Sequence, residues 1–472
     1  MSTNQRWVLR LTAVASLMVV LDALVVSTAL SAIRRDLHAS PTQLEWTVNG
    51  YALSFAVLLM TAAVLGDRLG RRRILCVGIG VFVAASAGCA LSPSVDWLIA
   101  CRVLQGAGAA LVMPVALALL GAAFPPADRP RALGVFAGVS GLAVPLGPLL
   151  GGAVVQGISW PWIFWLNVPT GLALIALVLA RIGESHGPRG AVDAPGVLLV
   201  TGAALGIVWG LVRGNPAGWD SPEVIGSLTA GVILTVGFVI CEHRASAPML
   251  PMRLFASRRF SAGNAVAFFH WGSAFGAVFF MSQFLQNGLG YGPLAAGLRL
   301  MPWGATTIIV PQLAGRLIGR FGERRFVVGG MSLHGGSMVW IALVARPHLA
   351  YVQLVVPLVL SGAGVAMSLP AAQSAVLSAV EPQDIGRASG AFSTLRQLGG
   401  AFGVAVLVAV FAGAGGYGSR QAFSDGFVAA IATCGGLALA AALAGSALPG
   451  RRPAPAPATA QPPPSPALQA RR

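Results

Sequence analysis

One acidic residue lies in the middle of the first long apolar segment of the chain. Asp22 has apolar residues on both sides in LMVVLDALVVSTAL (residues 17–30). A charge at the centre of a bilayer costs at least ~2.5–3.5 kcal/mol on insertion scales, so a carboxylate there needs a function or a partner. Asp22 is therefore the first candidate for chemistry.

Arg102 is the candidate partner of Asp22. It lies in a later apolar segment, at a depth similar to that expected for Asp22, and opposite charges attract each other in a medium of low dielectric constant. Gln105 follows on the same helical face as Arg102. We predict that Asp22 takes up a proton, while Arg102 adjusts its proton affinity and holds the ionised carboxylate. A purely structural ion pair is the alternative.

Polar and aromatic residues in the other apolar segments predict a broad substrate cavity. Aromatic, amide and basic groups in a mostly apolar wall suit a site for varied ligands. Packing against lipid or another helix explains each residue about equally well, and the histidines fit hydrogen-bonded residues inside a bundle better than ligand-binding ones. The candidates are Asn49, Gln105, His270, Trp271, Gln283, Trp303, Gln312, Gln373 and Arg396.

The sequence carries no motif typical of an enzyme or a metalloprotein. It lacks the G-x-x-x-x-G-K-[ST] of ATP-driven motors, and it lacks HExxH and paired-cysteine patterns. The five cysteines lie in different apolar segments and fit small packing residues. We therefore expect no enzymatic activity, no catalytic residue, no metal and no cofactor, with the proton gradient as the energy source.

The elements that must position these residues are membrane-spanning helices. Of 472 residues, 56% are hydrophobic and only 10% are charged. A helix needs about 20 apolar residues to cross a bilayer, and such runs recur along most of the chain. A closed barrel would instead show alternating segments of about 10 residues. The fold class is thus an all-α polytopic membrane protein, with fourteen transmembrane helices predicted near 8–32, 46–65, 74–92, 97–120, 131–155, 162–181, 195–212, 223–241, 261–286, 294–315, 326–345, 350–373, 388–411 and 424–448.

The arginines predict the orientation of these helices. All 31 basic residues are arginine, and with the N-terminus inside, 23 fall in inside loops or tails and 5 in outside loops. Basic residues are enriched in cytoplasmic loops, so both termini are expected in the cytoplasm. The net charge of +16 is dispersed over many short loops, which argues against nucleic-acid binding.

The sequence repeats itself. VLQGAGAALVMP (103–114) matches VLSGAGVAMSLP (359–370) at an offset of 256, and AVLGDRLGRRR (63–73) matches GRLIGRFGERR (315–325) at an offset of 252. Parallel repeats are an architecture of membrane transporters, with the substrate site between the repeats. We predict an N-terminal six-helix bundle (1–190), two inserted helices with linker loops (191–258), a C-terminal six-helix bundle (259–449) and a disordered cytoplasmic tail (450–472).

The repeat also separates the two halves chemically. Asp22 aligns with Ala274, and Arg102 aligns with Leu358. The second half therefore lacks the acid and its partner, and we assign the proton chemistry to the N-terminal half.

A charged turn follows the second predicted helix. It contains Asp67, Arg68, Gly70 and Arg71, followed by two further arginines. A carboxylate and guanidinium groups can pair across two moving bundles, so this turn is predicted to be a latch that closes the cytoplasmic side. The alternative is that the arginines only set the orientation.

The fifth predicted helix carries glycine and proline on one face. Residues 134, 138, 141, 145, 148 and 152 step by three or four, which places them on one side of a helix. Small residues allow close helix packing, and proline removes backbone donors and favours bending. A bendable sliding seam between the halves is predicted, with static close packing as the alternative. The residues are Gly134, Gly138, Gly141, Pro145, Gly147, Pro148, Gly151 and Gly152.

Taken in order, these motifs resemble the major facilitator superfamily, and within it the fourteen-helix drug/proton antiporters. LDALVVSTALSAI (21–33), LGDRLGRRR (65–73), LIACRVLQGAGAA (98–110), GVSGLAVPLGPLLGG (138–152), WPWIFWLNVPTG (160–171) and LRQLGGAFG (395–403) carry the resemblance. Two positions depart from the pattern, since Ala63 and Ala143 stand where glycines are usual. The resemblance covers nearly the whole chain except the tail.

The resemblance implies a major facilitator fold and the export of drugs, antibiotics or a natural product in exchange for protons. A proton-coupled uptake symporter of the same fold is the alternative, and the glycine- and proline-rich fifth helix argues for export. The partners expected are a small amphipathic substrate, protons and the lipid bilayer, with the protein acting as a monomer. Because the spans hold one central acid and three arginines, neutral, zwitterionic or anionic cargo is favoured. The lack of lysine suggests a GC-rich bacterium and its plasma membrane.

Overall fold

A computed structural model of the chain is almost entirely helical. It describes residues 1–125, 128–187, 193–245, 248, 250, 252–381 and 384–450, and no strand occurs among them. In this described part, eleven helical segments are long and apolar enough to cross a membrane. The predicted all-α membrane class is confirmed, whereas the number of fourteen crossings stays a prediction.

The first part of the chain forms helices that coincide with the first six predicted spans. They are α1 (Thr3–Asp36), α2 (Pro41–Leu69), α3 (Arg71–Ala90), α4 (Val95–Ala123), the pair α5 (Arg129–Gly141) and α6 (Ala143–Gly157), and the pair α7 (Trp162–Trp165) and α8 (Asn167–Arg181).

The remaining helices coincide with the other eight predicted spans. They are α9 (Ala194–Ala217), α10 (Pro222–Arg244), the 3-10 helix η1 (Met252–Ala256), α11 (Arg258–Gln283), the π-helical turn η2 (Phe284–Gly288), α12 (Pro293–Phe321), α13 (Glu323–Val344), α14 (Val352–Leu377), α15 (Ile385–Ala414) and α16 (Arg420–Ser446).

Local signals explain where several helices begin and end. Ser2 and Ser40 each form a capping box with a glutamine three residues later, so backbone donors at the helix starts are satisfied. Between α2 and α3 the chain turns at Gly70, whose φ of 105° favours glycine, and Gly322 (φ 82°) does the same between α12 and α13. These two glycines stand at the 252-residue offset of the repeat, so the same turn is built twice.

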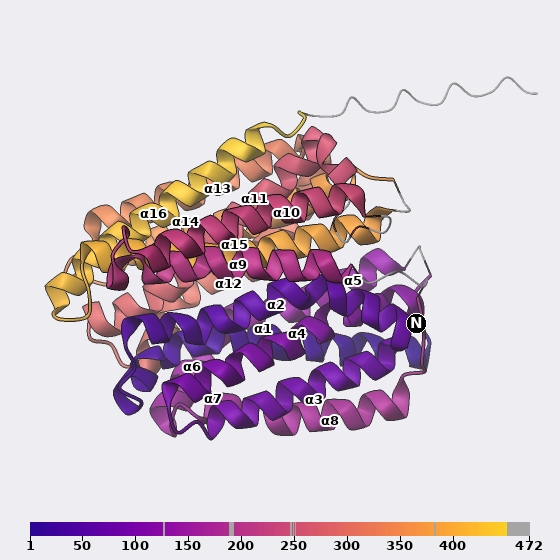
Figure 1. The fold of residues 1–472 in the computed structure, drawn as a ribbon, viewed down its shortest axis with the longest axis horizontal. Helices are drawn as coiled ribbons and strands as arrows, with labels where there is room; N and C mark the ends of the chain where they lie inside the picture. The colour runs from indigo at the N-terminus through magenta and orange to yellow at the C-terminus, as the bar shows by residue number, and fades with distance from the viewer. Residues whose placement is uncertain are drawn as a thin grey trace, which may run out of the picture.

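The helices pack into two groups that lie side by side (Figure 1). In one group α4 packs against α2 and α3, and in the other α14 packs in the same way against α12 and α13. Two seams join the groups, α6 against α12 and α2 against α15. α9 packs against α15 and α2, and α10 packs against α9. We call α1–α8 the N half and α11–α16 the C half. The boundaries at 190 and 258 stay predictions, and residues 188–192 and 451–472 lie outside the described residues.

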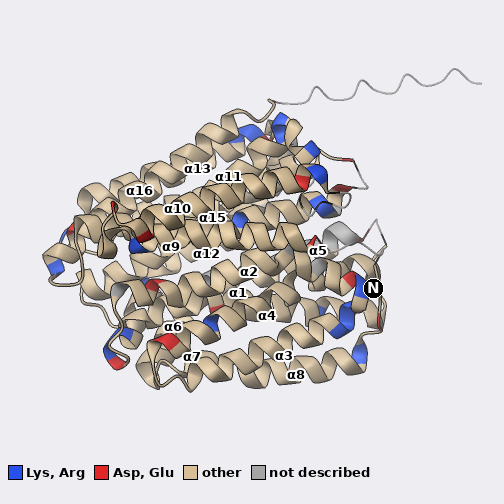
Figure 2. Ribbon diagram, viewed as in Figure 1, with Lys and Arg blue, Asp and Glu red and all other residues tan. Residues whose placement is uncertain are grey.

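Charged residues gather at the two ends of the helices (Figure 2). We call the end that holds the start of α1 and Arg71 the arginine-rich end. At the opposite end hydrogen bonds join the halves: the Ser282 hydroxyl donates to the Ser27 carbonyl at 3.2 Å, and the backbone N–H of Leu294 donates to Gln156 at 3.2 Å. We call this the sealed end, because polar contacts join the two halves across it.

Candidate functional site

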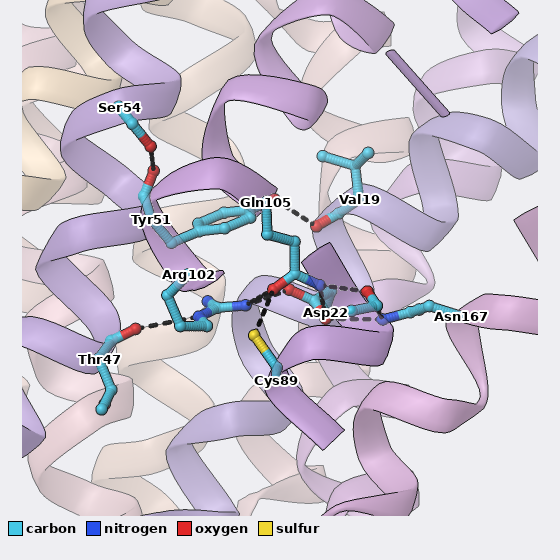
Figure 3. Close-up of polar contacts among 10 residues, drawn as sticks. Val19, Asp22, Thr47, Tyr51, Ser54, Cys89, Arg102, Gln105 and Asn167 are labelled. Atoms are coloured by element: carbon cyan, nitrogen blue, oxygen red, sulfur yellow. Dashed lines mark hydrogen bonds and ion pairs between the residues drawn. The ribbon is translucent and has the colours of Figure 1, made fainter. Parts of the chain in front are cut away.

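Asp22 lies in the middle of α1, buried inside the N half, where Arg102, Gln105 and Asn167 point toward it (Figure 3). Its Oδ2 accepts from Arg102 Nη1 at 2.5 Å, and its Oδ1 accepts from Gln105 Nε2 at 2.9 Å and from Asn167 Nδ2 at 2.8 Å. Ser86 completes the set, because its hydroxyl accepts from Gln105 at 2.6 Å and from Asn167 at 3.2 Å. We call these five residues the Asp22 cluster.

Arg102 is fixed in place by groups other than Asp22. It is only 1% exposed, its Nη1 also donates to Gln105 Oε1 at 2.6 Å, and its Nε donates to the Thr47 carbonyl at 3.0 Å. Its guanidinium carbon lies 4.3 Å from the centre of the Tyr51 ring, a cation–π arrangement. The guanidinium is thus oriented by three elements, and the predicted pairing of Asp22 with Arg102 is present in the structure.

Sequence reasoning missed Asn167, Ser86, Thr47 and Tyr51 as parts of this site. Asn167 is the first residue of α8 and lies within the quoted motif WPWIFWLNVPTG, so an amide in a long apolar stretch was the available signal. Ser86 gave no such signal, because a hydroxyl in an apolar helix usually bonds to its own backbone. Thr47 gave none either, because it accepts from Arg102 through its backbone carbonyl.

The arrangement suits a carboxylate that changes its charge. Three N–H groups point at the two carboxylate oxygens, so the ionised form is fully hydrogen-bonded in this state. Adding a proton to either oxygen removes one acceptor position and weakens the ion pair with Arg102. Because all partners come from α3, α4 and α8, a change at Asp22 alters how α1 packs within the N half.

The charged turn between α2 and α3 forms its ion pair locally. Asp67 Oδ1 lies 2.7 Å from Arg71 Nη2 on the following turn, while Arg68 is exposed. The segment after α8 holds the turn in place by two backbone hydrogen bonds. The Arg71 N–H donates to the Ser185 carbonyl at 2.8 Å, and the Gly187 N–H donates to the Asp67 carbonyl at 3.1 Å. The predicted pairing across the halves is therefore not made in this state. At this end, the ion pairs among described residues each lie within one half or join it to the preceding linker.

The fifth predicted helix is broken into two pieces. α5 ends at Gly141 and α6 begins at Ala143, four and two residues before Pro145, which has no N–H to donate to a carbonyl in the preceding turn. The side chain of Pro145 lies outside what the structure describes, as does the surrounding of Gly134. A Cβ on Gly138 or Gly141 would meet open space.

The glycines of α6 make close contacts on two sides. A Cβ on Gly147 would lie 2.7 Å from Leu24 Cβ, and one on Gly151 would lie 2.3 Å from Thr28 Oγ1, both on α1. A Cβ on Gly152 would lie 2.4 Å from the Pro293 carbonyl of α12, in the other half. Pro148 takes part in the same contact, because its carbonyl would lie 2.2 Å from a Cβ on Gly297. The small residues therefore allow α6 to approach both α1 and α12.

Comparison with known proteins identifies the family. The family model of the Major Facilitator Superfamily matches residues 12–404, with a second match over 264–470. The chain belongs to the Major Facilitator Superfamily.

Several characterised superfamily members are similar to this chain. It is 36% identical over 398 residues to the tetracenomycin C resistance and export protein of Streptomyces glaucescens. The matched region covers 84% of this chain and 74% of that protein. It is 34% identical over 414 residues to the multidrug resistance protein Stp of Mycobacterium tuberculosis, covering 87% and 77%.

Solved structures share the fold at low sequence identity. A peptide transporter POT in complex with sulfate has a TM-score of 0.69 at 16% identity, covering 92% of this chain and 93% of that one. A bacterial homologue of the human lysosomal transporter Spinster, in an inward-facing and unoccupied conformation, has a TM-score of 0.68 at 17% identity, covering 97% and 100%. The predicted major facilitator fold is confirmed.

In this superfamily member the residues predicted to line a substrate cavity do not all share one environment. His270 is fully buried within the C half and lies 2.9 Å from the Ser368 hydroxyl, and the Trp303 Nε1 donates to Ser361 at 3.0 Å. Gln105 belongs to the Asp22 cluster. These contacts fit residues inside a bundle, and the cavity role of these three residues stays a prediction.

The other cavity candidates lie on five helices, α2, α11, α12, α14 and α15. Arg396 of α15 is stacked 4.9 Å from the centre of the Trp271 ring of α11. Gln283 is buried and accepts from the Tyr417 hydroxyl, Gln373 is exposed, and the side chain of Gln312 lies outside what the structure describes. Asn49 of α2 is fully buried, and neither atom of its amide has a hydrogen-bond partner.

Proposed function

We propose that this protein is a secondary active exporter that moves drugs, antibiotics or a natural product out of the cell in exchange for protons by alternating access. The Asp22 cluster is the observation that carries the proposal, since it holds a carboxylate at the centre of a helix bundle with every oxygen bonded. The resistance and export proteins to which the chain is similar support the direction of transport and the class of cargo.

The proposed orientation places both termini in the cytoplasm of a bacterial cell, with the arginine-rich end inside and the sealed end outside. In this orientation the state described is inward-facing, because the hydrogen bonds that join the halves lie at the outer end. The protein works as a monomer and draws its energy from the proton gradient without a cofactor.

Proton exchange at Asp22 then acts through the packing of α1. In the ionised state Arg102, Gln105 and Asn167 hold α1 against α4 and α8. Protonation removes the negative charge, and Arg102 keeps its bonds to Gln105 and the Thr47 carbonyl. α1 is then free to shift relative to α4, and α1 also carries the contacts of Ser27 and Thr28 with the C half. A change of charge is thereby linked to the closure between the halves.

The turn at Asp67 and the seam at Gly152 are assigned to the conformational change. When the arginine-rich end closes, the Asp67–Arg71 pair comes within reach of the C half and stabilises the outward-facing state. The α6–α12 contact at Gly152 slides or opens as the outer end separates, and the break before Pro145 lets α6 move relative to α5.

The nearest alternative is a proton-coupled uptake symporter of the same fold. The two differ in the direction in which cargo moves relative to protons, and the similarity to export proteins favours the exporter. For the cargo, we propose neutral, zwitterionic or anionic molecules, a proposal that fails if quaternary ammonium dyes prove to be the best substrates.

The decisive experiment uses everted membrane vesicles with an imposed acid-inside pH gradient. A panel of antibiotics and dyes is added, and proton release is followed for the wild type, Asp22→Asn and Asp96→Asn. Asp96 is an exposed acid in the first turn of α4 and serves as the matched control. We expect substrate-dependent release in the wild type and the control, and none in Asp22→Asn.

Two results would overturn the proposal. Full-rate release in Asp22→Asn would remove Asp22 from proton coupling. No release with any compound, together with gradient-driven uptake in intact cells, would make the protein an importer.

A further inference from the structure

A second acid is buried in the chain, at the sealed end. Glu45 lies in the second turn of α2 and is 4% exposed. Its Oε2 has no hydrogen-bond partner, and no ion pair reaches it among the described residues. It stands one residue before the predicted span 46–65, so the sequence predicts Asp22 as the one central acid.

Glu45 borders a cavity of about 120 Å³ between the two halves. α2 supplies the acid from the N half, and α11, α15 and the turn after α15 supply the rest of the wall from the C half. The main lining residues are Phe279, Phe280, Val408, Phe411 and Tyr417. The carboxyl group therefore faces an aromatic and apolar wall that exists only while the halves are in contact.

The charged and titratable groups near Glu45 are engaged elsewhere. The Tyr417 hydroxyl donates to Gln283, and burial raises the pKa of this phenol well above its usual range, so it stays neutral. The Arg34 guanidinium of α1 lies over the Tyr417 ring at 4.3 Å, and Arg102 pairs with Asp22. α11 and α15 present only apolar side chains to the cavity, and the turn after α15 adds two glycines and Tyr417.

The repeat makes the position of Glu45 unusual. The 252-residue offset places Gly297 at the same position in the C half, where α12 meets α6. There the two helices are so close that a Cβ on Gly297 would lie 2.2 Å from the Pro148 carbonyl. In the α6–α12 seam the backbones of the two helices are thus in direct contact. In the equivalent α2–α15 seam, a carboxyl group lies between the halves.

We propose that Glu45 is a second proton-binding site, and that it must hold a proton for the sealed end to close. A carboxylate without a donor partner is strongly unfavourable in apolar surroundings, whereas the neutral acid is tolerated. Opening this end hydrates Glu45 and allows it to ionise. Closure therefore takes up a proton, and by linkage a lower pH favours the closed arrangement.

The use of this site rests on the proposed function, although its existence does not. In an exporter, acid outside the cell would protonate Glu45, seal the outer end and return the protein to the inward-facing state after cargo release. Asp22 would exchange its proton separately, inside the N half.

The test measures the opening of the sealed end without any substrate. Val408 lines the cavity and is 5% exposed, so Val408→Cys reports access to it. The protein is labelled with a membrane-impermeant maleimide at pH 6 and pH 8.5, in intact cells and in everted vesicles, and the label on protein without the added cysteine is subtracted. We compare the ratio of labelling at pH 8.5 to labelling at pH 6, measured from the face at the sealed end. We expect this ratio to be at least about fivefold larger in the protein with Glu45 than in the Glu45→Gln variant, whose neutral amide keeps that end closed.

The controls separate this result from other effects. Asp425→Asn removes an exposed acid from α16 at the same end and is expected to label like the wild type. Glu45→Leu serves as a second neutral variant if the glutamine variant folds poorly. The proposal is overturned if Glu45→Gln and the wild type show the same pH dependence. Since no cargo is added and the assay reads the accessibility of a cysteine, not transport, that outcome would leave the export proposal untouched.

Discussion

The N half and the C half of this protein share an architecture but differ in the chemistry of their centres. At the centre of the N half lies a buried ion pair between Asp22 and Arg102, with amides around it. The repeat offsets place Ala274 and Leu358 at these positions in the C half. One half therefore contains a group that can change its charge, and the other has two apolar side chains in its place.

The C half fills the equivalent space with a neutral hydrogen-bonded chain. The Trp303 Nε1 donates to the Ser361 hydroxyl at 3.0 Å, this hydroxyl lies 2.8 Å from His334 Nδ1, and His334 Nε2 lies 2.9 Å from the Ser273 hydroxyl. Ser361 stands at the position of Gln105, and Trp303 at that of Tyr51. Such a chain holds α11, α12, α13 and α14 together without carrying a charge. The two halves therefore hold their helices together differently, the N half by a buried ion pair and the C half by this neutral chain of hydrogen bonds.

Replacing Arg102 by leucine, the residue at the equivalent position of the C half, should have the largest effect on stability and transport. Arg102→Leu leaves Asp22 buried without a counter-charge, which typically costs ~3–5 kcal/mol. We expect a lower midpoint of thermal unfolding in detergent and no proton-coupled transport. Unchanged stability would mean that Asp22 already holds a proton in this state.

Replacing both members of the pair separates stability from function. In Asp22→Ala with Arg102→Leu, the residues match Ala274 and Leu358 of the C half, and exchanging a buried ion pair for apolar residues is often neutral or stabilising by about 1–4 kcal/mol. The double variant should therefore recover the thermal midpoint that Arg102→Leu loses, yet stay inactive in the vesicle assay. Recovery of transport would show that the two halves do not differ in function.

Removing a single amide from the Asp22 cluster should have a smaller effect. Asn167→Ala takes away one of the two amide donors to Asp22 Oδ1, and hydrogen bonds to charged groups contribute about 1.5–3 kcal/mol. The ionised carboxylate is then less stable, so the pH profile of transport should move to higher pH. Asn264→Ala is the matched control, because Asn264 is buried in the C half and bonds only to the Phe260 carbonyl of its own helix. A profile that moves equally in both variants would argue against the cluster.

The smallest effect on transport is expected in the C-half chain. Ser361→Ala leaves the Trp303 N–H without an acceptor, at a cost of about 1–3 kcal/mol in stability. Proton-driven transport should stay within about twofold of the wild type with the same pH profile, measured in the same vesicles. A shifted profile would mean that the C half also takes part in proton coupling.

The helices and the central ion pair could be predicted from the sequence because both follow from the cost of polar groups in lipid. Long apolar runs located the helices, and Asp22 and Arg102 stood out because a charge is expensive there. Asn167 and Ser86 are neutral, so placing them in an apolar helix costs less free energy and their sequence positions do not stand out. That they converge on Asp22 follows only from the three-dimensional packing. Glu45 was missed because it lies at the edge of a predicted span, where a charge normally reaches water.

Two other features depend on the state of the molecule and could not be read from residue patterns. The sequence of the turn at Asp67 allows ion pairs within one half or across the halves, and the pairs that its described residues form, Asp67–Arg71 and Arg72–Glu184, both lie within the N-terminal part of the chain. The steps of three and four in the fifth helix predicted one face, but not that Gly147 and Gly151 contact α1 while Gly152 contacts α12.

The confinement of the Asp22 cluster to α1, α3, α4 and α8 has a consequence for the diversification of such proteins. No member of the cluster lies on α11–α16, so residues on the C-half side of the interface can be exchanged without touching the acid or its donors. Chemical selectivity and energy conversion can then be inherited separately. A lineage of such chains can then change its cargo by substitutions in the C half while it retains the Asp22 cluster.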